Sequence, residues 1–197
     1  MVIGLVGKSC AGKDVAAARY SQRGVACIDV DALGHESLVV NRDAVAQAFG
    51  PSVLNEDGSV NRKALGALVF ADAGRLEVLN GISHPWMRSR VEDFIRNRDL
   101  CMINCALLEE MDLVPLCDEI LFFWAPFEQR MERALKRDGI TQEAFRQRDS
   151  SQKDIGSTLF ECGRRVITII NDRDLEYLYR QLDFYYDTLQ TRGYVYG

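Results

Sequence analysis

The opening stretch of the chain, MVIGLVGKSCAGKD (residues 1–14), decides the fold. An apolar run at residues 2–6 leads into glycine, which is typical of a buried strand. The next residues read G-x-x-x-x-G-K-D, one residue away from the loop that binds phosphates between a strand and a helix. Residues 14–23, with Gly24 after them, predict that helix. We therefore expect nucleotide contacts from Gly7, Lys8, Ser9, Cys10, Ala11, Gly12, Lys13, Asp14 and Val15.

Asp14 is the one departure from this motif. Backbone N–H groups and the lysine of such a loop hold the phosphates of ATP, and a following Ser or Thr hydroxyl binds Mg²⁺. Asp14 could simply be a favourable acid in the first turn of a helix. Our hypothesis is that its carboxylate binds Mg²⁺, directly or through water, because carboxylates suit this hard ion. The competing interpretation is that metal handling is impaired and catalysis is weak.

The rest of the chain alternates strand and helix patterns. Apolar runs at residues 25–30, 100–105, 119–124 and 165–170 are separated by helical patterns, and a last helix is expected at residues 175–189. This rhythm predicts an α/β protein with three layers, in which helices cover both faces of a mostly parallel five-stranded sheet. The core would comprise residues 1–31, 99–126 and 163–197.

Two intervals are too long for simple crossovers between parallel strands. Residues 32–98 hold about four helical patterns, with turn signals at Gly50-Pro51, Asp57-Gly58 and Ser83-His84-Pro85. We expect a substrate-binding helical insertion here, because ligands of open α/β sheets bind at this edge. Residues 127–162 are rich in arginine, and Gly139 divides them into two helices. This composition suits a mobile lid.

Two acids follow the second predicted strand, at the sheet edge that the phosphate loop shares. A carboxylate from Asp29 or Asp31 could orient or deprotonate an attacking hydroxyl and help to hold Mg²⁺. Acids at such positions also serve as helix caps.

Arginines of the predicted lid form a second candidate cluster. Arg130, Arg133 and Arg137 are spaced so that a helix would place them on one face, and Arg146 and Arg148 follow. Arginines stabilise the charge of a phosphoryl group in transfer. The alternative is a solvated helix in which Glu128 and Glu132 pair with them.

Composition narrows the class of protein. The net charge of −5 argues mildly against a nucleic-acid partner. No apolar stretch approaches the length of a membrane helix, and the first residues do not resemble a signal peptide. The six cysteines lack metal-ligand spacing and are expected to be free thiols in a reducing compartment. We predict a cytoplasmic protein with small-molecule partners and make no prediction of its oligomeric state.

With these motifs in place, the chain resembles the dephospho-coenzyme A kinases. Ile28-Asp29-Val30-Asp31 matches the family's I-D-A-D segment, and Ile82-Ser83-His84-Pro85 its I-x-H-P. Further matches are residues 49–54, Asp57-Gly58, residues 65–70, residues 106–110, Glu128, Gln129, Arg133, Arg137, Gln152 and Asn171.

The resemblance implies transfer of the ATP γ-phosphate to the ribose 3′-hydroxyl of dephospho-coenzyme A, the last step of coenzyme A synthesis, with Mg²⁺. It implies that Asp31 is the catalytic carboxylate, that Lys13, Arg133 and Arg137 act on the phosphates, and that Asn171 lies near adenine. It further implies acceptor contacts from Asp31, His84, Arg88 and Glu110. Departures at Val6, Lys8, Cys10, Ala11, Asp14 and Ala106 keep two alternatives open: another small-molecule kinase, and a nucleotide-binding protein without catalysis.

Overall fold

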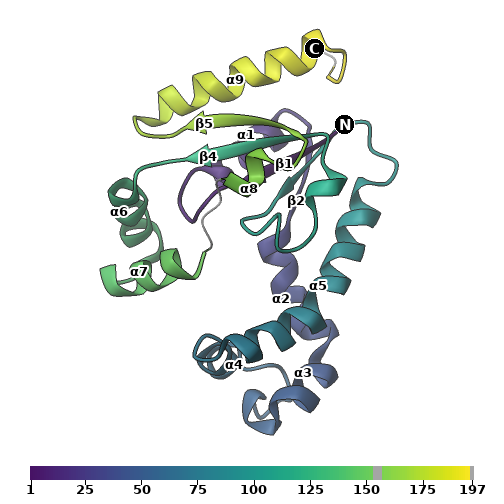
Figure 1. Cartoon of the computed structure of the whole chain (residues 1–197), viewed down its shortest axis with the longest axis vertical. Helices are drawn as coiled ribbons and strands as arrows, with labels where there is room; N and C mark the ends of the chain where they lie inside the picture. The colour runs from purple at the N-terminus through teal and green to yellow at the C-terminus, as the bar shows by residue number, and fades with distance from the viewer. Residues whose placement is uncertain (153–156, 196–197) are drawn as a thin grey trace. The chain divides into compact units, whose positions relative to one another are not determined.

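The computed structural model describes residues 1–152 and 157–195 and divides the chain into two units (Figure 1). The first unit contains Met1–Ile28 and Ile95–Gly197, and the second contains Asp29–Phe94. Residues 153–156 of the predicted lid lie outside the described residues.

The first unit is built on the predicted sheet. Its strands are β1 (Val2–Val6), β2 (Ala26–Asp29), β3 (Cys101–Asn104), β4 (Glu119–Trp124) and β5 (Arg165–Ile170). They are arranged in the order β2-β3-β1-β4-β5, and β1 pairs in parallel with both β3 and β4, as β4 does with β5. The three-layer α/β prediction is confirmed, and β4 and β5 have the predicted bounds.

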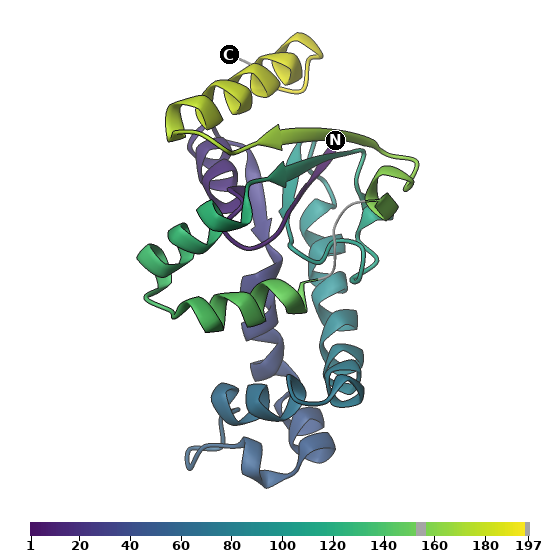
Figure 2. The same cartoon turned by 60° about the vertical axis from the view of Figure 1, so that its left-hand side comes forward.

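Alternating side chains on the strands pack against different layers. Leu121 and Phe123 of β4 join a core with helices α1 (Lys13–Gln22) and α9 (Leu175–Thr191). The intervening Phe122 packs edge-on against Phe160 of α8 (Ser157–Phe160), with ring centroids 5.8 Å apart. This period of two is what a strand buried on both faces requires. Helix α9 runs beside β5 in both views (Figures 1 and 2).

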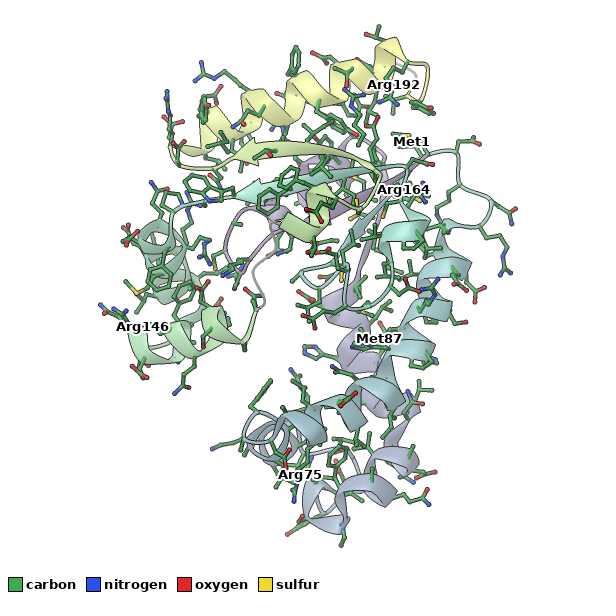
Figure 3. All side chains as sticks on the ribbon, in the orientation of Figure 1. Met1, Arg75, Met87, Arg146, Arg164 and Arg192 are labelled. Atoms are coloured by element: carbon green, nitrogen blue, oxygen red, sulfur yellow. The ribbon has the colours of Figure 1, made fainter. Side chains whose placement is uncertain are left out.

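A buried carboxylate at the start of β4 binds side chains of helix α9 and so holds this helix against the sheet. Glu119 is 4 % exposed and accepts a hydrogen bond from the Tyr185 hydroxyl at 2.7 Å. The Arg192 guanidinium, at the end of α9 (labelled in Figure 3), lies 2.8 Å from the same carboxylate. Such pairing is what keeps a buried charge tolerable.

The predicted lid contains the two helices expected on either side of Gly139, and the short α8 follows them in the same interval. Helix α6 (Phe127–Asp138) ends at Gly139, whose φ of 63° is left-handed, and α7 (Gln142–Ser151) begins after Thr141. The Thr141 side chain caps α7 by accepting a hydrogen bond from the Ala144 N–H. The Phe127 and Phe145 rings join the two helices at a centroid distance of 5.5 Å.

The second unit is helical. It contains α2 (Val30–Val40), α3 (Arg42–Phe49), α4 (Arg62–Val69) and α5 (Ala73–Ile95), with a short 3-10 helix, η1 (Pro51–Val53), between α3 and α4. Its core is centred on Val45, Val53, Leu65 and Val69. The predicted turn at Asp57-Gly58 is present, with Gly58 at φ +79°.

The predicted turn at Ser83-His84-Pro85 is wrong, because α5 runs through it without a break. A proline inside a helix removes a hydrogen bond and crowds the carbonyl four residues earlier, at a cost of about 3 kcal/mol. Ser83, Met87 and Val91 are all buried, and their four-residue spacing forms one stripe across the proline. Burial of this stripe offsets the cost and explains why the local turn signal failed.

Candidate active site

The loop between β1 and α1 has the backbone that a phosphate site needs. Gly7 has φ +152°, and a Cβ there would lie 2.4 Å from the Phe123 carbonyl oxygen. Gly12 has φ +119°, and a Cβ there would lie 2.6 Å from Nδ2 of Asn171. No side chain fits at either position, which explains why these two residues of the loop are glycines.

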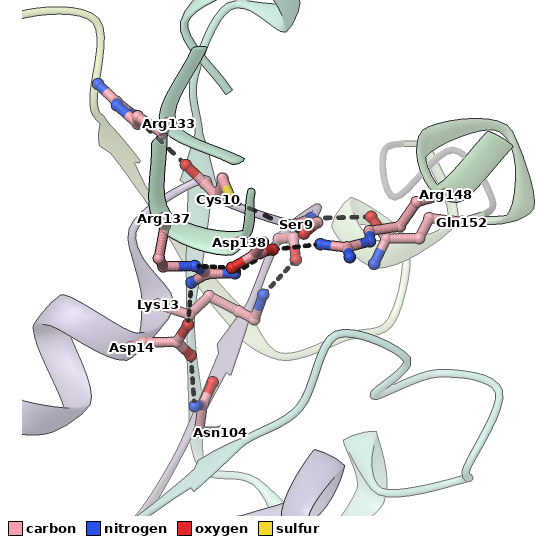
Figure 4. Close-up of polar contacts among 11 residues, drawn as sticks. Ser9, Cys10, Lys13, Asp14, Asn104, Arg133, Arg137, Asp138, Arg148 and Gln152 are labelled. Carbon is pink, nitrogen blue, oxygen red and sulfur yellow. Dashed lines mark hydrogen bonds and ion pairs between the residues drawn. The ribbon is translucent and has the colours of Figure 1, made fainter. Parts of the chain in front are cut away.

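Lys13, the first residue of α1, lies across this loop. Its side chain is 6 % exposed, and its Nζ donates a hydrogen bond to the Gly7 carbonyl at 2.7 Å (Figure 4). The contact holds the ammonium group over the loop, where the lysine of such a motif meets the β- and γ-phosphates.

The three arginines of α6 have different partners. Arg130 is 6 % exposed; it donates to Asp149 of α7 at 2.6 Å and to the Ala125 carbonyl at 3.1 Å. Arg133 donates to the Cys10 carbonyl at 3.4 Å and to the Asn171 carbonyl at 3.0 Å, and burial lowers its pKa. Arg130 therefore joins α6 to α7 and also donates to the Ser9 carbonyl of the phosphate loop at 3.4 Å, whereas Arg133 joins α6 to that loop and to Asn171.

Arg137 contacts Asp14, the residue at which the phosphate-loop motif departs from its usual sequence. Its Nη1 donates to Oδ2 of Asp14 at 3.1 Å, and its Nε donates to Asp138 at 2.7 Å (Figure 4). Arg148 of α7 also donates to Asp138, at 2.7 Å. Hydrogen bonds from these two arginines lower the pKa of Asp138 to about 2.

Asn104, at the end of β3, holds the other oxygen of Asp14. Its Nδ2 donates to Oδ1 of Asp14 at 3.1 Å (Figure 4). Asn104 is 4 % exposed, and its own Oδ1 is buried with no hydrogen-bond partner among the described residues. Asp14 thus lies between an amide and a guanidinium, and no group of three His, Cys, Asp or Glu residues in the described ranges could hold a metal ion.

A cavity of about 480 Å³ opens beside the loop. Val15, Leu175 and Leu178 give it apolar walls, and Arg133 and Arg137 line it as well. Asn171, also in the lining, is fixed by a 2.8 Å hydrogen bond from Nδ2 to the Ala11 carbonyl. Apolar walls beside several cations and a phosphate loop suit a nucleotide.

Comparison with known proteins agrees with this geometry. The family model described as dephospho-CoA kinase matches residues 1–163, which is most of the chain. The chain belongs to the dephospho-CoA kinase family. A dephospho-CoA kinase of Symbiobacterium thermophilum is 33% identical over 180 residues, covering 87% of this chain and 74% of the relative.

Solved structures show the same fold. A protein of Thermus thermophilus, 26% identical, aligns with a TM-score of 0.80 over 96% of this chain and 97% of that one. A dephospho-CoA kinase from Campylobacter jejuni, 21% identical, aligns with a TM-score of 0.71 over 98% of each chain. In the described part of the chain, no helix is both long enough and apolar enough to cross a membrane.

Several residues that family resemblance singled out lie in the second unit. Asp29 caps α2 by accepting hydrogen bonds from the N–H groups of Asp31 and Ala32 at 3.0 and 3.2 Å, as the alternative interpretation of that acid expected. Asp31 lies in the first turn of α2, and His84 and Arg88 lie in α5, where Arg88 donates to Glu92 at 3.0 Å. The acceptor-site roles of Asp31, His84 and Arg88, and of the exposed Glu110 in the first unit, stay predictions.

Sequence reasoning about this dephospho-CoA kinase fold missed two contributors to the site. Asn104 could have been found, because it is the polar end of an apolar strand at the edge where the phosphate loop lies. Asp149 gave no signal, since nothing in the sequence relates it to Arg130, nineteen residues earlier. Arg146 lies against the Phe127 ring, with 5.8 Å between its guanidinium carbon and the ring centroid (labelled in Figure 3).

Proposed function

We propose that this chain transfers the γ-phosphate of ATP to the ribose 3′-hydroxyl of dephospho-coenzyme A and releases ADP and coenzyme A. One observation carries the proposal: the chain matches the dephospho-CoA kinase family over residues 1–163 and retains, within that match, the two glycines and the lysine of the phosphate loop. Membership of a fold alone would not identify an acceptor.

The first unit would bind and activate ATP. Backbone N–H groups of the loop and Lys13 would hold the β- and γ-phosphates, and the adenine would occupy the cavity beside Asn171. Arg133 and Arg137 would neutralise the charge that develops on the phosphoryl group in transfer. Arg130 would instead join the lid helices to the loop, because its guanidinium donates to Asp149 and to the Ala125 and Ser9 carbonyls.

The second unit would bind the acceptor, with contacts from Asp31, His84 and Arg88, together with Glu110 of the first unit. The 3′-hydroxyl oxygen would attack the γ-phosphorus while the bond from that phosphorus to the bridging oxygen breaks. The hydroxyl proton would pass to the Asp31 carboxylate, the role that a catalytic-loop Asp has in other kinases. Helices α6 and α7 would form the lid over the phosphates.

The family implies Mg²⁺, and two groups of this structure fit a hard cation. The Asp14 carboxylate lies at the loop, and the buried Oδ1 of Asn104 has no hydrogen-bond partner among the described residues. Both are oxygen ligands of the type that Mg²⁺ prefers. When bound, Mg²⁺ would neutralise phosphate charge.

A cytoplasmic location is part of the proposal. All six cysteines, each within the described residues, are free thiols, which suits a reducing compartment. Burial raises the pKa of Cys117 to about 12, so this thiol is inert packing.

The test is a coupled assay of ADP release with ATP, Mg²⁺ and dephospho-coenzyme A. Parallel reactions would contain adenosine, AMP, CMP or no acceptor, and Lys13→Met would be the inactive control. Turnover with dephospho-coenzyme A alone is the expected result. Turnover with another acceptor instead, or with none of them despite ATP binding, would overturn the proposal.

A further inference from the structure

Asp14 and Asn104 occupy the two positions from which P-loop proteins hold Mg²⁺. In that class a Ser or Thr directly after the loop lysine is one ligand, and an Asp at the end of a neighbouring strand is the other. Here Asp14 follows the lysine, and Asn104 ends β3, which pairs with β1. The acidic and the neutral residue have exchanged places between the two positions.

The two side chains are in contact, so the exchange is local. The amide nitrogen of Asn104 donates to the Asp14 carboxylate at 3.1 Å. In either arrangement the pair offers one carboxylate and one neutral oxygen, because the Asn104 amide oxygen replaces the hydroxyl as the neutral group. The sum of charges beside the phosphates is therefore the same.

A second, independent observation points to a ligand at this place. Asn104 is 96 % buried, since its exposed fraction is 4 %. Its Oδ1 nevertheless has no hydrogen-bond partner in the described chain. A buried carbonyl oxygen without a partner is costly, and such atoms in native proteins call for an explanation such as a missing ion or water.

The Arg137 guanidinium shows that the carboxylate already attracts a cation. It lies 3.1 Å from the Asp14 oxygen that Asn104 does not hold. Both partners are about half exposed, with 52% and 63% of their side chains accessible, so this ion pair can open at little cost.

We propose that Asp14 and Asn104 are an exchanged pair of Mg²⁺ ligands, in which the carboxylate has moved from the strand end to the phosphate loop. Asp14 would hold the ion that accompanies ATP in place of Arg137, and Arg137 would keep its pair with Asp138. The inference rests on the proposed function for its nucleotide, and it assigns the roles of two residues in this chain.

A reciprocal exchange of the two residues tests the proposal. The variants are Asp14→Thr, Asn104→Asp and the double variant with both changes, which restores the usual arrangement. Asp14→Asn is a nearly isosteric second probe, and Asp43→Asn, exposed on α3, is the control for a lost negative charge. The measurement is the affinity for ADP and for a non-hydrolysable ATP analogue by calorimetry, with and without Mg²⁺. Thermal unfolding of each variant confirms that it folds.

The readout is the gain in nucleotide affinity that Mg²⁺ produces. Removing a metal-supporting group should reduce this gain roughly 10–100-fold in Asp14→Thr and Asp14→Asn. The double variant should recover most of that loss, and Asp43→Asn should match the wild type. A gain that is unchanged in both Asp14 variants, or a double variant no better than Asp14→Thr alone, would overturn the exchange.

The outcome separates this inference from the proposed function. If the wild type turns over dephospho-coenzyme A while its Mg²⁺ gain does not depend on Asp14, the exchange fails and the kinase assignment stands. If the wild type binds no adenine nucleotide under any condition, the kinase assignment fails and the exchange fails with it.

Discussion

Replacement of Arg130 by Met should destabilise the protein while leaving most of the packing around it in place. The Arg130 side chain is 7% exposed and the Asp149 side chain 17%, and their charged groups are 2.6 Å apart. Removing one partner of a buried ion pair costs about 3–5 kcal/mol, because the other charge stays buried and unpaired. Asp149 keeps some solvent and has Lys8 at 3.8 Å, so we expect a smaller loss, about 2–3 kcal/mol. The Met side chain keeps an apolar stem of similar length but loses the guanidinium, whose carbon lies 5.8 and 5.9 Å from the Phe127 and Phe145 ring centroids.

Scanning calorimetry and urea titration measure this effect. A loss of that size lowers the unfolding midpoint by about 5–10 °C in a protein of this length. Adding Asp149→Asn removes the stranded charge, so the double variant should recover about 1–2 kcal/mol relative to Arg130→Met alone. Arg42→Met breaks an exposed pair with Asp43 and should change stability by less than about 0.5 kcal/mol. If Arg130→Met unfolds at the same temperature as Arg42→Met, Arg130 does not join α6 to α7 as we describe.

Three further predictions concern the loop and the lid. Gly12→Ala should lower ATP affinity at least tenfold, because its Cβ would lie 2.6 Å from Asn171 at a φ of +119°; binding at the wild-type level would contradict the loop geometry. Cys10 has a left-handed φ of 61°, which costs about 1 kcal/mol for a residue other than glycine. Cys10→Gly should remove this cost but increase the entropy of the unfolded chain, so we expect a net gain in stability of about 0.5 kcal/mol. A lower unfolding temperature would contradict this. The pKa of Asp138 is about 2 in the folded protein against 3.8 ordinarily, so its pairs stabilise the lid above pH ~4, and this contribution of about 1 kcal/mol is lost as the pH falls toward 2. Asp138→Asn should therefore be less stable than the wild type at pH 7 and no less stable at pH 2, in unfolding curves recorded at both values.

The sheet was predictable because its signal is local. The apolar and aromatic run of β4 is nearly continuous, as in a strand buried on both faces, and β5, an edge strand, keeps a β-branched run; the bounds of both were predicted to the residue. The end of α6 at Gly139 was predictable for the same reason, because glycine readily adopts the left-handed backbone that ends the helix there. The turn at Pro85 failed because the deciding quantity, burial of the stripe through Ser83 and Met87, is a property of the folded unit.

The sequence predicted those parts of the site that lie within a local motif, but not the contacts between motifs. The loop and the face shared by the α6 arginines follow from spacing, but the partners of those arginines do not. The structure pairs Arg130 with Asp149 and Arg137 with Asp14, which lie 19 and 123 residues away, whereas the sequence suggested Glu128 and Glu132 in the same helix. Helical periodicity fixes which residues share a face, and only the tertiary fold fixes what that face meets.

At Asp14, a motif read along the chain cannot distinguish a carboxylate that has changed position from a metal ligand that has been lost. From the sequence alone, the missing hydroxyl indicates a defective metal site and a weakened enzyme. In the fold, Asp14 contacts Asn104 as well as Arg137, and Asn104 lies where a P-loop protein usually carries its acid. The acid at position 14 and the amide at position 104 together carry the same charge as the usual pair. Asp14→Thr alone would therefore leave two neutral groups beside the phosphates. Its loss of Mg²⁺ dependence would fit our proposal, but it would equally fit a simple need for a carboxylate at position 14. The double variant separates these explanations, since it moves the carboxylate back to the strand end and keeps the total charge constant.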